Sequence, residues 1–274
     1  MVHKSPDYGL QKPPHGARLD LENPLAQGLV GFWAMTEGSG EIVHDLSGRN
    51  NHGTLTNMDP AADWVGSQSG WALDFDGSDD IVELGVSRVY LPSTTQPLTV
   101  LVTARPSAIG LEAYSERVFT VRRTHPSQSA LLLGFDDSSK AFYFNGTSRT
   151  EIASGISVGT WYTLGVTYSG SSSTTWFQGM QATSPDGASF AAAGGDVYRA
   201  RIGAGPEVQW YHGAVSACGV WHRVLSAAEV AAWTADPFAL LRPAEPRFWS
   251  LGGGSRESIM IRNITIRNRT IGGF

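Results

Sequence analysis

The chain has 274 residues, of which 41% are hydrophobic, 10% aromatic and only 16% charged, and its formal net charge is −5. This acidic balance argues against a general affinity for nucleic acid, and the single cysteine, Cys218, excludes an internal disulfide framework. No apolar run reaches the roughly 18 residues that cross a bilayer. No apolar leader opens the sequence either, so we expect no membrane insertion and no signal peptide.

Residues 1–27 are rich in proline, lysine and histidine. Pro6, Pro13, Pro14 and Pro24 block regular structure, because proline lacks a backbone donor and has a fixed φ. We therefore predict an extended N-terminal arm over residues 1–27.

Residues 28–249 form the predicted body, where short alternating segments are separated by Gly, Asp, Asn and Ser turns. This density of short strands is typical of an antiparallel sandwich of two sheets. The predicted strands are 29–34, 71–76, 80–84, 98–105, 116–122, 130–136, 140–145, 161–168, 174–178, 198–203 and 213–221.

One short helix is predicted over residues 225–233. Ser226 is a suitable N-cap and Glu229 completes a capping box. Val230 and Trp233 share one face, which we expect to dock on the sandwich, and Asp236-Pro237 ends the helix.

The C-terminal segment, residues 250–274, follows a different pattern. After Gly252–Gly254, isoleucines alternate with polar residues in a stretch that carries four arginines and one glutamate, a local charge of +3. Such a strand cannot bury its apolar face alone. It either closes an edge of its own sandwich or adds to the sheet of another subunit, and the triglycine favours the second. The predicted interface residues are Ile259, Ile261, Arg262, Ile264, Ile266, Arg267 and Arg269.

Several motifs carry a resemblance to a known family. They are Gly28-Leu-Val-Gly-Phe-Trp33 with Asp45-Leu-Ser-Gly48, then Asp76-Gly-Ser-Asp-Asp80, Trp161 to Tyr168, and Arg201 to Val230. Together they resemble laminin-G-like, concanavalin A-like jelly-roll domains over residues 28–235. The resemblance implies an all-β, two-sheet antiparallel jelly-roll sandwich. Ser216-Ala217 and Ser169 depart from the acidic residues that the family usually has there.

The flanking segments, around Lys12-Pro-Pro14 and Ala235-Asp-Pro237, resemble laminin-G-like proteins encoded by tailed phages. That likeness implies a structural protein on the surface of a virion: a capsid decoration, head-fibre or tail component. Its expected partners are copies of itself and other virion proteins. We expect synthesis in the host cytoplasm, assembly through the terminal arms, and a homo-oligomer.

The acidic turns are the candidate metal site. Ca²⁺ takes six to eight oxygen ligands, and the resemblance implies that two turns meet at one rim and hold calcium. The opposing interpretation is that these side chains only satisfy turn backbone. The candidate ligands are Asp45, Asn50, Asn51, Asp76, Asp79 and Asp80.

A sugar site needs exposed aromatic rings and nearby polar groups. Trp210, Tyr211 and His212, in a turn-flanked segment, are the first candidates. Host surface glycans are therefore the second class of expected partner, and a calcium-assisted carbohydrate-binding adhesin is the alternative function.

An enzymatic function is not expected. No Glu is followed two residues later by Asp, so the Glu-x-Asp-x-Glu pattern of jelly-roll glycoside hydrolases is absent. Gly155-Ile-Ser-Val-Gly159 matches G-x-S-x-G, but a nucleophile elbow needs a helix directly after it, and a strand is predicted there instead.

Overall fold

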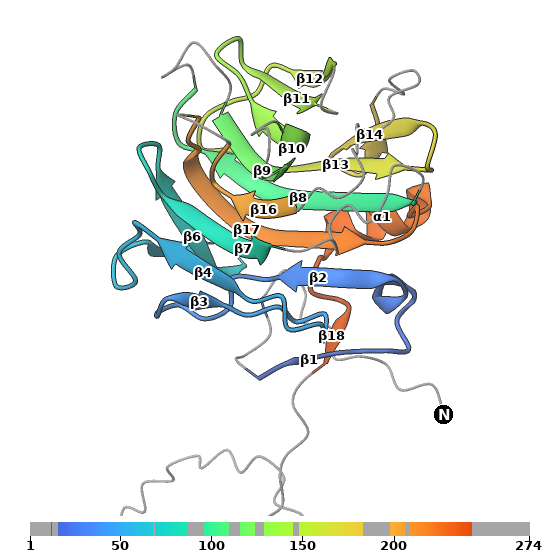
Figure 1. The fold of residues 1–274 in the computed structure, drawn as a ribbon, viewed down its shortest axis with the longest axis horizontal. Helices are drawn as coiled ribbons and strands as arrows, with labels where there is room; N and C mark the ends of the chain where they lie inside the picture. The colour runs from blue at the N-terminus through green and yellow to red at the C-terminus, as the bar shows by residue number, and fades with distance from the viewer. Residues whose placement is uncertain are drawn as a thin grey trace, which may run out of the picture. The chain divides into compact units, whose positions relative to one another are not determined.

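The computed structural model describes residue 12 and residues 16–67, 69–86, 96–109, 116–123, 129–144, 148–182, 198–205 and 209–242. These residues form a two-sheet antiparallel β-sandwich with one short α-helix (Figure 1). No helix in these ranges is long and apolar enough to span a membrane. The predicted fold class is confirmed, and each of the eleven predicted strands is present.

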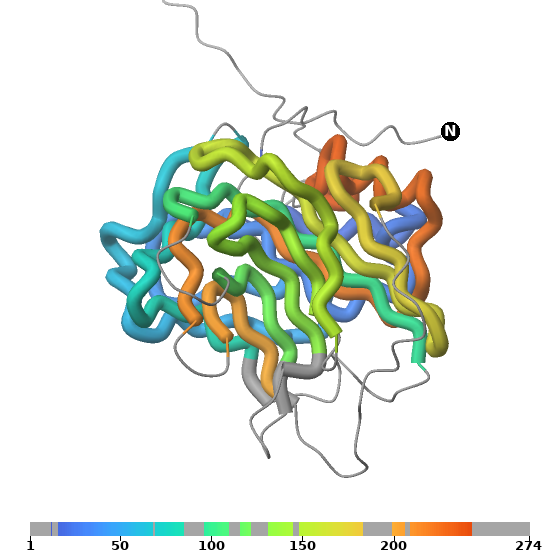
Figure 2. Tube along the Cα trace, turned by 90° about the horizontal axis from the view of Figure 1, so that it is seen from above, coloured from blue at the N-terminus to red at the C-terminus, as the bar shows by residue number. Residues whose placement is uncertain are grey.

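The first sheet, sheet I, has eight strands. Figure 2 shows β16 between β9 and β7, two strands that lie far from it in sequence. In spatial order the strands are β12 (Arg149–Ser154), β11 (Lys140–Phe144), β10 (Ser129–Phe135), β9 (Glu116–Arg123), β16 (Tyr198–Ile202), β7 (Ile81–Val86), β4 (Gly53–Thr56) and β3 (Ile42–Val43).

The second sheet, sheet II, also has eight strands, and β17 lies at its centre. One edge of β17 pairs with β8, while the other pairs with both β6 and β2. The strands are β15 (Met180–Gln181), β14 (Ser173–Phe177), β13 (Tyr162–Tyr168), β8 (Leu98–Pro106), β17 (His212–Trp221), β6 (Gly70–Asp76) and β5 (Trp64–Ser67), with β2 (Leu29–Trp33) on β17.

Two apolar clusters lie on the two faces of sheet II. The main core, between the sheets, contains Phe75, Phe119, Val166 and the free thiol Cys218. The second cluster covers the outer face of sheet II and includes Trp221 and Trp233. A single strand contributes side chains to both clusters, because successive residues of a strand point to opposite faces of the sheet.

Helix α1 (Ala227–Ala235) closes the second cluster. The predicted capping box is confirmed: Ser226 Oγ accepts from the Glu229 amide, and the Glu229 carboxylate accepts from the Ser226 amide. Arg223 also pairs with Glu229 and, as the largest effect, lowers the pKa of that carboxyl to about 2. Trp233 packs edge-on against Trp221, with ring centroids 5.0 Å apart.

The N-terminal prediction needs a correction, because residues 16–27 belong to the body. Strand β1 (Arg18–Leu19) pairs with β18 (Leu241–Arg242), and a 3-10 helix, η1 (Pro24–Ala26), follows. Leu25 is buried in the second cluster. Proline stops long helices and strands, but it suits the first turn of η1. The predicted C-terminal arm and its interface residues lie outside the described residues.

Glu116, at the start of β9, carries a buried carboxyl group. Its residue is 6% exposed, and neither carboxylate oxygen has a hydrogen-bond partner. It pairs in register with Phe135, whose side chain lies in the main core. Burial raises the pKa of Glu116 to about 8, and the nearby His212 backbone amide lowers it only in part. The group is therefore neutral in the fold at pH 7.

This burial predicts a stability that declines with pH. The unfolded chain ionises Glu116 near 4.5, whereas the folded chain does so near 8. Between these values the folded state binds more protons, so the free energy of unfolding falls as pH rises from about 5 to about 8. Glu116→Gln should remove the contribution of Glu116 to this decline and raise stability at pH 8 by on the order of 3 kcal/mol. Urea unfolding at pH 5 and pH 8 measures it.

Glu41→Gln is the matched control, because Glu41 is exposed. It should leave the pH profile unchanged. A Glu116→Gln protein that keeps the full decline between pH 5 and pH 8 would contradict the assignment of that decline to Glu116.

Candidate functional site

The Asp76–Asp80 turn joins the two sheets at one end of the sandwich. Strand β6 of sheet II ends at Asp76, and β7 of sheet I begins at Ile81. Gly77 has a φ of +80°, a conformation that favours glycine. The turn is therefore a corner at which the chain passes from one layer to the other.

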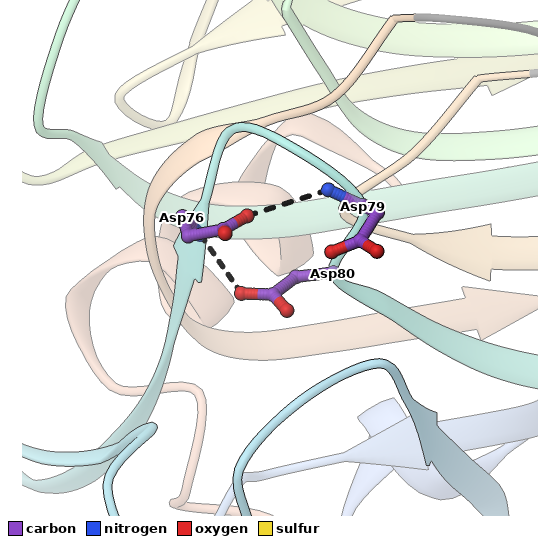
Figure 3. Close-up of side chains that lie close together, drawn as sticks. All are labelled: Asp76, Asp79 and Asp80. Atoms are coloured by element: carbon purple, nitrogen blue, oxygen red, sulfur yellow. Dashed lines mark hydrogen bonds between the residues drawn. The ribbon is translucent and has the colours of Figure 1, made fainter.

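Three carboxylates gather in this turn (Figure 3). One oxygen each from Asp76, Asp79 and Asp80 lies within 4.8 Å of the other two. Asp76 Oδ1 accepts from the Ser78 amide at 2.7 Å, and Asp80 Oδ2 accepts from the Asp76 amide at 2.9 Å. Among the described His, Cys, Asp and Glu side chains, no other group meets this spacing.

The acidic turn is electrostatically crowded. Asp76 and Asp79 are exposed, whereas Asp80 is 4% exposed. Burial is the largest cause that raises the pKa of Asp80 to about 6, and the Asp76, Asp63 and Asp79 carboxylates add to it. The Asp76 amide opposes the shift. A divalent cation would relieve this repulsion, and oxygen-only ligands fit Ca²⁺.

The other half of the predicted metal set lies in a separate turn and serves the backbone. Asp45 is buried and its carboxylate accepts four hydrogen bonds, from the amides of Phe32, Ser47 and Asn51 and from the Ser47 hydroxyl. Asn51 Nδ2 donates to the Val30 carbonyl at 2.8 Å.

The remaining member, Asn50, is an exposed turn residue with a φ of +60°. Asp45 does not belong to the three-carboxylate group. Asp45 and Asn51 therefore serve their own turn, and the group of carboxylates that could hold a metal ion consists of Asp76, Asp79 and Asp80.

The segment Trp210–His212 divides into three environments. Trp210 is half-buried and forms an isolated bridge with Ala204. Tyr211 is wholly buried between Phe75 and Phe135, so its ring is a core residue rather than a ligand contact. Trp210 and His212 are thus the partly exposed residues of this segment.

His212 lies directly beside the acidic turn. It pairs with Asp76 in the sheet II register, and a Cβ on Gly77 would meet the His212 Cβ at 2.8 Å. Its Nδ1 is buried and has no hydrogen-bond partner. The backbone of Gly203 also approaches the turn, since a Cβ there would lie 3.1 Å from the Asp80 carbonyl oxygen. The acidic turn therefore lies beside His212 and the backbone of Gly203.

Two features of this end were not anticipated from sequence. Arg105 lies 4.0 Å from Asp74, and its guanidinium stands over the Trp161 ring at 5.4 Å. Trp161, next to the start of β13, is only partly buried. The pairing of β8 with β17 and β13 brings these residues together. No local sequence motif predicts that they lie close to one another.

The G-x-S-x-G segment does not form a nucleophile elbow. Residues 155–161 connect β12 directly to β13 without a helix.

Comparisons with solved structures give matches at low sequence identity. The sialidase of Trypanosoma rangeli, solved with the inhibitor DANA, matches with a TM-score of 0.60 and 15% identity over 77% of this chain and 33% of the sialidase. Domain 4 of the arabinanase AbnA from Geobacillus stearothermophilus, solved with arabinotriose, matches with a TM-score of 0.55 and 13% identity. The match covers 75% of this chain and 98% of the arabinanase domain. The binding domain of Paraclostridial Mosquitocidal Protein 1 matches with a TM-score of 0.55 and 14% identity, over 77% of this chain and 52% of the binding domain.

These likenesses establish the shared fold, and this chain spans about a third of the sialidase. No curated protein matches the sequence. The family model described as the concanavalin A-like lectin/glucanases superfamily, Laminin_G_3, matches residues 76–231, which is more than half of the chain. The match begins at the first carboxylate of the acidic turn and ends within α1. The chain therefore belongs to the concanavalin A-like lectin/glucanase superfamily, as a Laminin_G_3 domain.

Proposed function

We propose that this domain is a non-catalytic carbohydrate-binding module that holds a glycan beside Ca²⁺ at the acidic turn. The observation that carries the proposal is the group of Asp76, Asp79 and Asp80, whose carboxylates lie within 4.8 Å of one another at an open corner of the sandwich. The superfamily contains lectins, and the arabinanase domain of the same fold was solved with a sugar ligand.

The chemistry follows from the ligand types. Bound Ca²⁺ supplies free coordination positions that neighbouring sugar hydroxyls can fill. The three carboxylates would hold the ion, and the partly exposed Trp210 would offer an apolar face for a sugar ring. Asn57 Nδ2 donates to the Asp79 carbonyl at 3.3 Å and so restrains the turn from the neighbouring β4–β5 connection.

The absence of catalysis is part of the proposal. Retaining and inverting glycosidases need two carboxyl groups set across a sugar in a cleft. The sequence has no Glu-x-Asp-x-Glu pattern, and Glu116, the carboxyl with the strongly raised pKa, lies in the core. Binding without turnover is the simpler reading of this surface.

Calcium binding should depend on both the turn and pH. The double variant Asp79→Asn, Asp80→Asn should lose Ca²⁺ binding, because it removes two of three anionic ligands. In the native protein, ionisation of Asp80 near pH 6 predicts affinity about tenfold higher at pH 7 than at pH 5. Isothermal titration calorimetry with CaCl₂ measures both.

Asp137→Asn is the control, since Asp137 is an exposed turn carboxylate outside the acidic group. It should bind Ca²⁺ as the native protein does. Equal Ca²⁺ binding by the native protein and the double variant would refute the metal assignment.

Glycan binding should follow the metal. A glycan array probed with CaCl₂ and then with EDTA should give signals that fall at least tenfold on chelation. Trp210→Ala should weaken the same signals if its indole stacks on the sugar, by about 1 kcal/mol or more. An array without a binder in either condition counts against the proposed function.

We also propose a second role, assembly of a phage-like particle through the C-terminal segment. It is supported by the sequence pattern, in which Ile264 and Ile266 alternate after a triglycine in a basic stretch. Within the described residues, β12 and β3 end sheet I and offer backbone groups to an added strand.

This second role predicts a change in oligomeric state. The full chain should form an oligomer in solution, whereas Ile264→Asp, Ile266→Asp in the full chain should give a monomer with an unchanged melting temperature. Multi-angle light scattering measures the mass. Oligomers of equal size from both proteins would exclude the segment as the contact.

A further inference from the structure

A pocket of about 150 Å³ lies on the outer face of sheet II, beside the C-terminal end of α1. Thr103 of β8 and Ser216 of β17 line it from the sheet, and Trp161 and Phe238 line it with aromatic rings. Thr234, in the last turn of α1, lines it as well. It shares no residue with the acidic turn.

The orientation of the sheet residues follows from the strand alternation. Val102 and Ala104 belong to the main core between the sheets, so Thr103 points to the opposite face. Val215 also enters the core, and the pairing of β17 with β8 shifts register between Val215 and Ala217. This shift leaves Ser216 beside the pocket.

Hydroxyl side chains line the pocket, among them those of Thr103, Ser216 and Thr234. Ser216 is 4% exposed, and no hydrogen bond to its hydroxyl is present among the described residues. Thr103 Oγ1 and Thr163 Oγ1 lie 3.0 Å apart, and Thr234 Oγ1 donates to the Val230 carbonyl at 2.9 Å. A polar ligand in the pocket would bond to the Ser216 hydroxyl.

Cationic groups stand beside both aromatic rings. The Arg105 guanidinium lies 5.4 Å from the Trp161 ring centroid, and its Nε is buried without a partner. The Lys12 ammonium lies 5.3 Å from the Phe238 ring and donates to the carbonyls of Ser216 and Met35, at 2.8 and 3.2 Å, and to that of Trp71. Lys12 and Arg105 therefore stand against the Phe238 and Trp161 rings, and neither side chain lines the pocket itself.

We propose that this pocket binds one pyranose ring of a glycan, as a second sugar site that is independent of calcium. Only the choice of a sugar as the ligand of this pocket rests on the proposed function. An apolar sugar face fits the partly exposed ring of Trp161, while sugar hydroxyls fit the Ser216 and Thr103 side chains. The volume lies below the 300–1,000 Å³ typical of pockets for drug-sized ligands, so it admits a single ring rather than a chain.

The test uses the full chain in EDTA, so that the calcium-dependent site is silent. Methyl glycosides of glucose, galactose and mannose are titrated and followed by calorimetry and by amide chemical shifts. At least one should bind with a Kd of about 1 mM, worth about 4 kcal/mol, and should shift the amides of Thr103 and Ser216. Trp161→Ala should weaken it at least tenfold, and Ser216→Leu, which fills the pocket, should abolish it.

Two controls separate this proposal from the proposed function. Val158→Ala, at an exposed residue before Trp161, and the double variant Asp79→Asn, Asp80→Asn should both bind the glycoside normally in EDTA. Binding that survives in both Trp161→Ala and Ser216→Leu overturns the pocket but leaves the proposed function standing. Sugar binding that appears only with CaCl₂ likewise overturns the pocket and leaves the proposed function standing. No binding in either condition overturns both.

Discussion

The register of β17 is the constraint on which the rest of the sandwich depends. Val215, Cys218 and Val220 enter the main core, whereas Ala217 and Trp221 enter the cluster beneath α1. Because side chains alternate along a strand, a slip by one residue would exchange these two sets and expose apolar groups on both sides. Three neighbouring strands, β8, β6 and β2, hold the register. The shift after Val215 is tolerated inside this frame, and it sets Ser216 beside the pocket.

The two acidic turns show how similar sequences acquire different chemistry. The Asp45 carboxylate accepts four hydrogen bonds from its own turn and from β2, so its lone pairs are already engaged. In the other turn, Asp76, Asp79 and Asp80 face one another with few protein donors, and repulsion adds to burial in raising the pKa of Asp80. A carboxylate that protein donors satisfy gains little from a bound cation, whereas a cation beside three crowded carboxylates would relieve their mutual repulsion.

Local pattern predicts the elements of this chain well because each depends on near neighbours. The alternation of Thr99 to Thr103 and the Ser226–Glu229 capping box are contained within one strand and one helix turn, and both are present as predicted. Facing partners depend on pairing between distant strands. Tyr211 enters the core because Phe75 and Phe135 lie opposite it, and Trp161 is partly exposed at the edge of a pocket that α1 completes. The sequence neighbours of Tyr211 and Trp161 predict neither the burial of the first nor the partial exposure of the second.

Arg223 links the N-terminal segment to α1, the helix whose C-terminal end borders the pocket. Its guanidinium donates to the carbonyls of Pro24 and Gln27 and pairs with Glu229 in the first turn of α1. It thereby fixes the N-terminal segment and the helix to the same point, while Trp233 fixes the helix to Trp221. Since Thr234 and Phe238 line the pocket, its shape is determined by how α1 docks and not by sheet II alone. The acidic turn, by contrast, is held by the two sheets directly, which is the physical reason to expect the two sites to act independently.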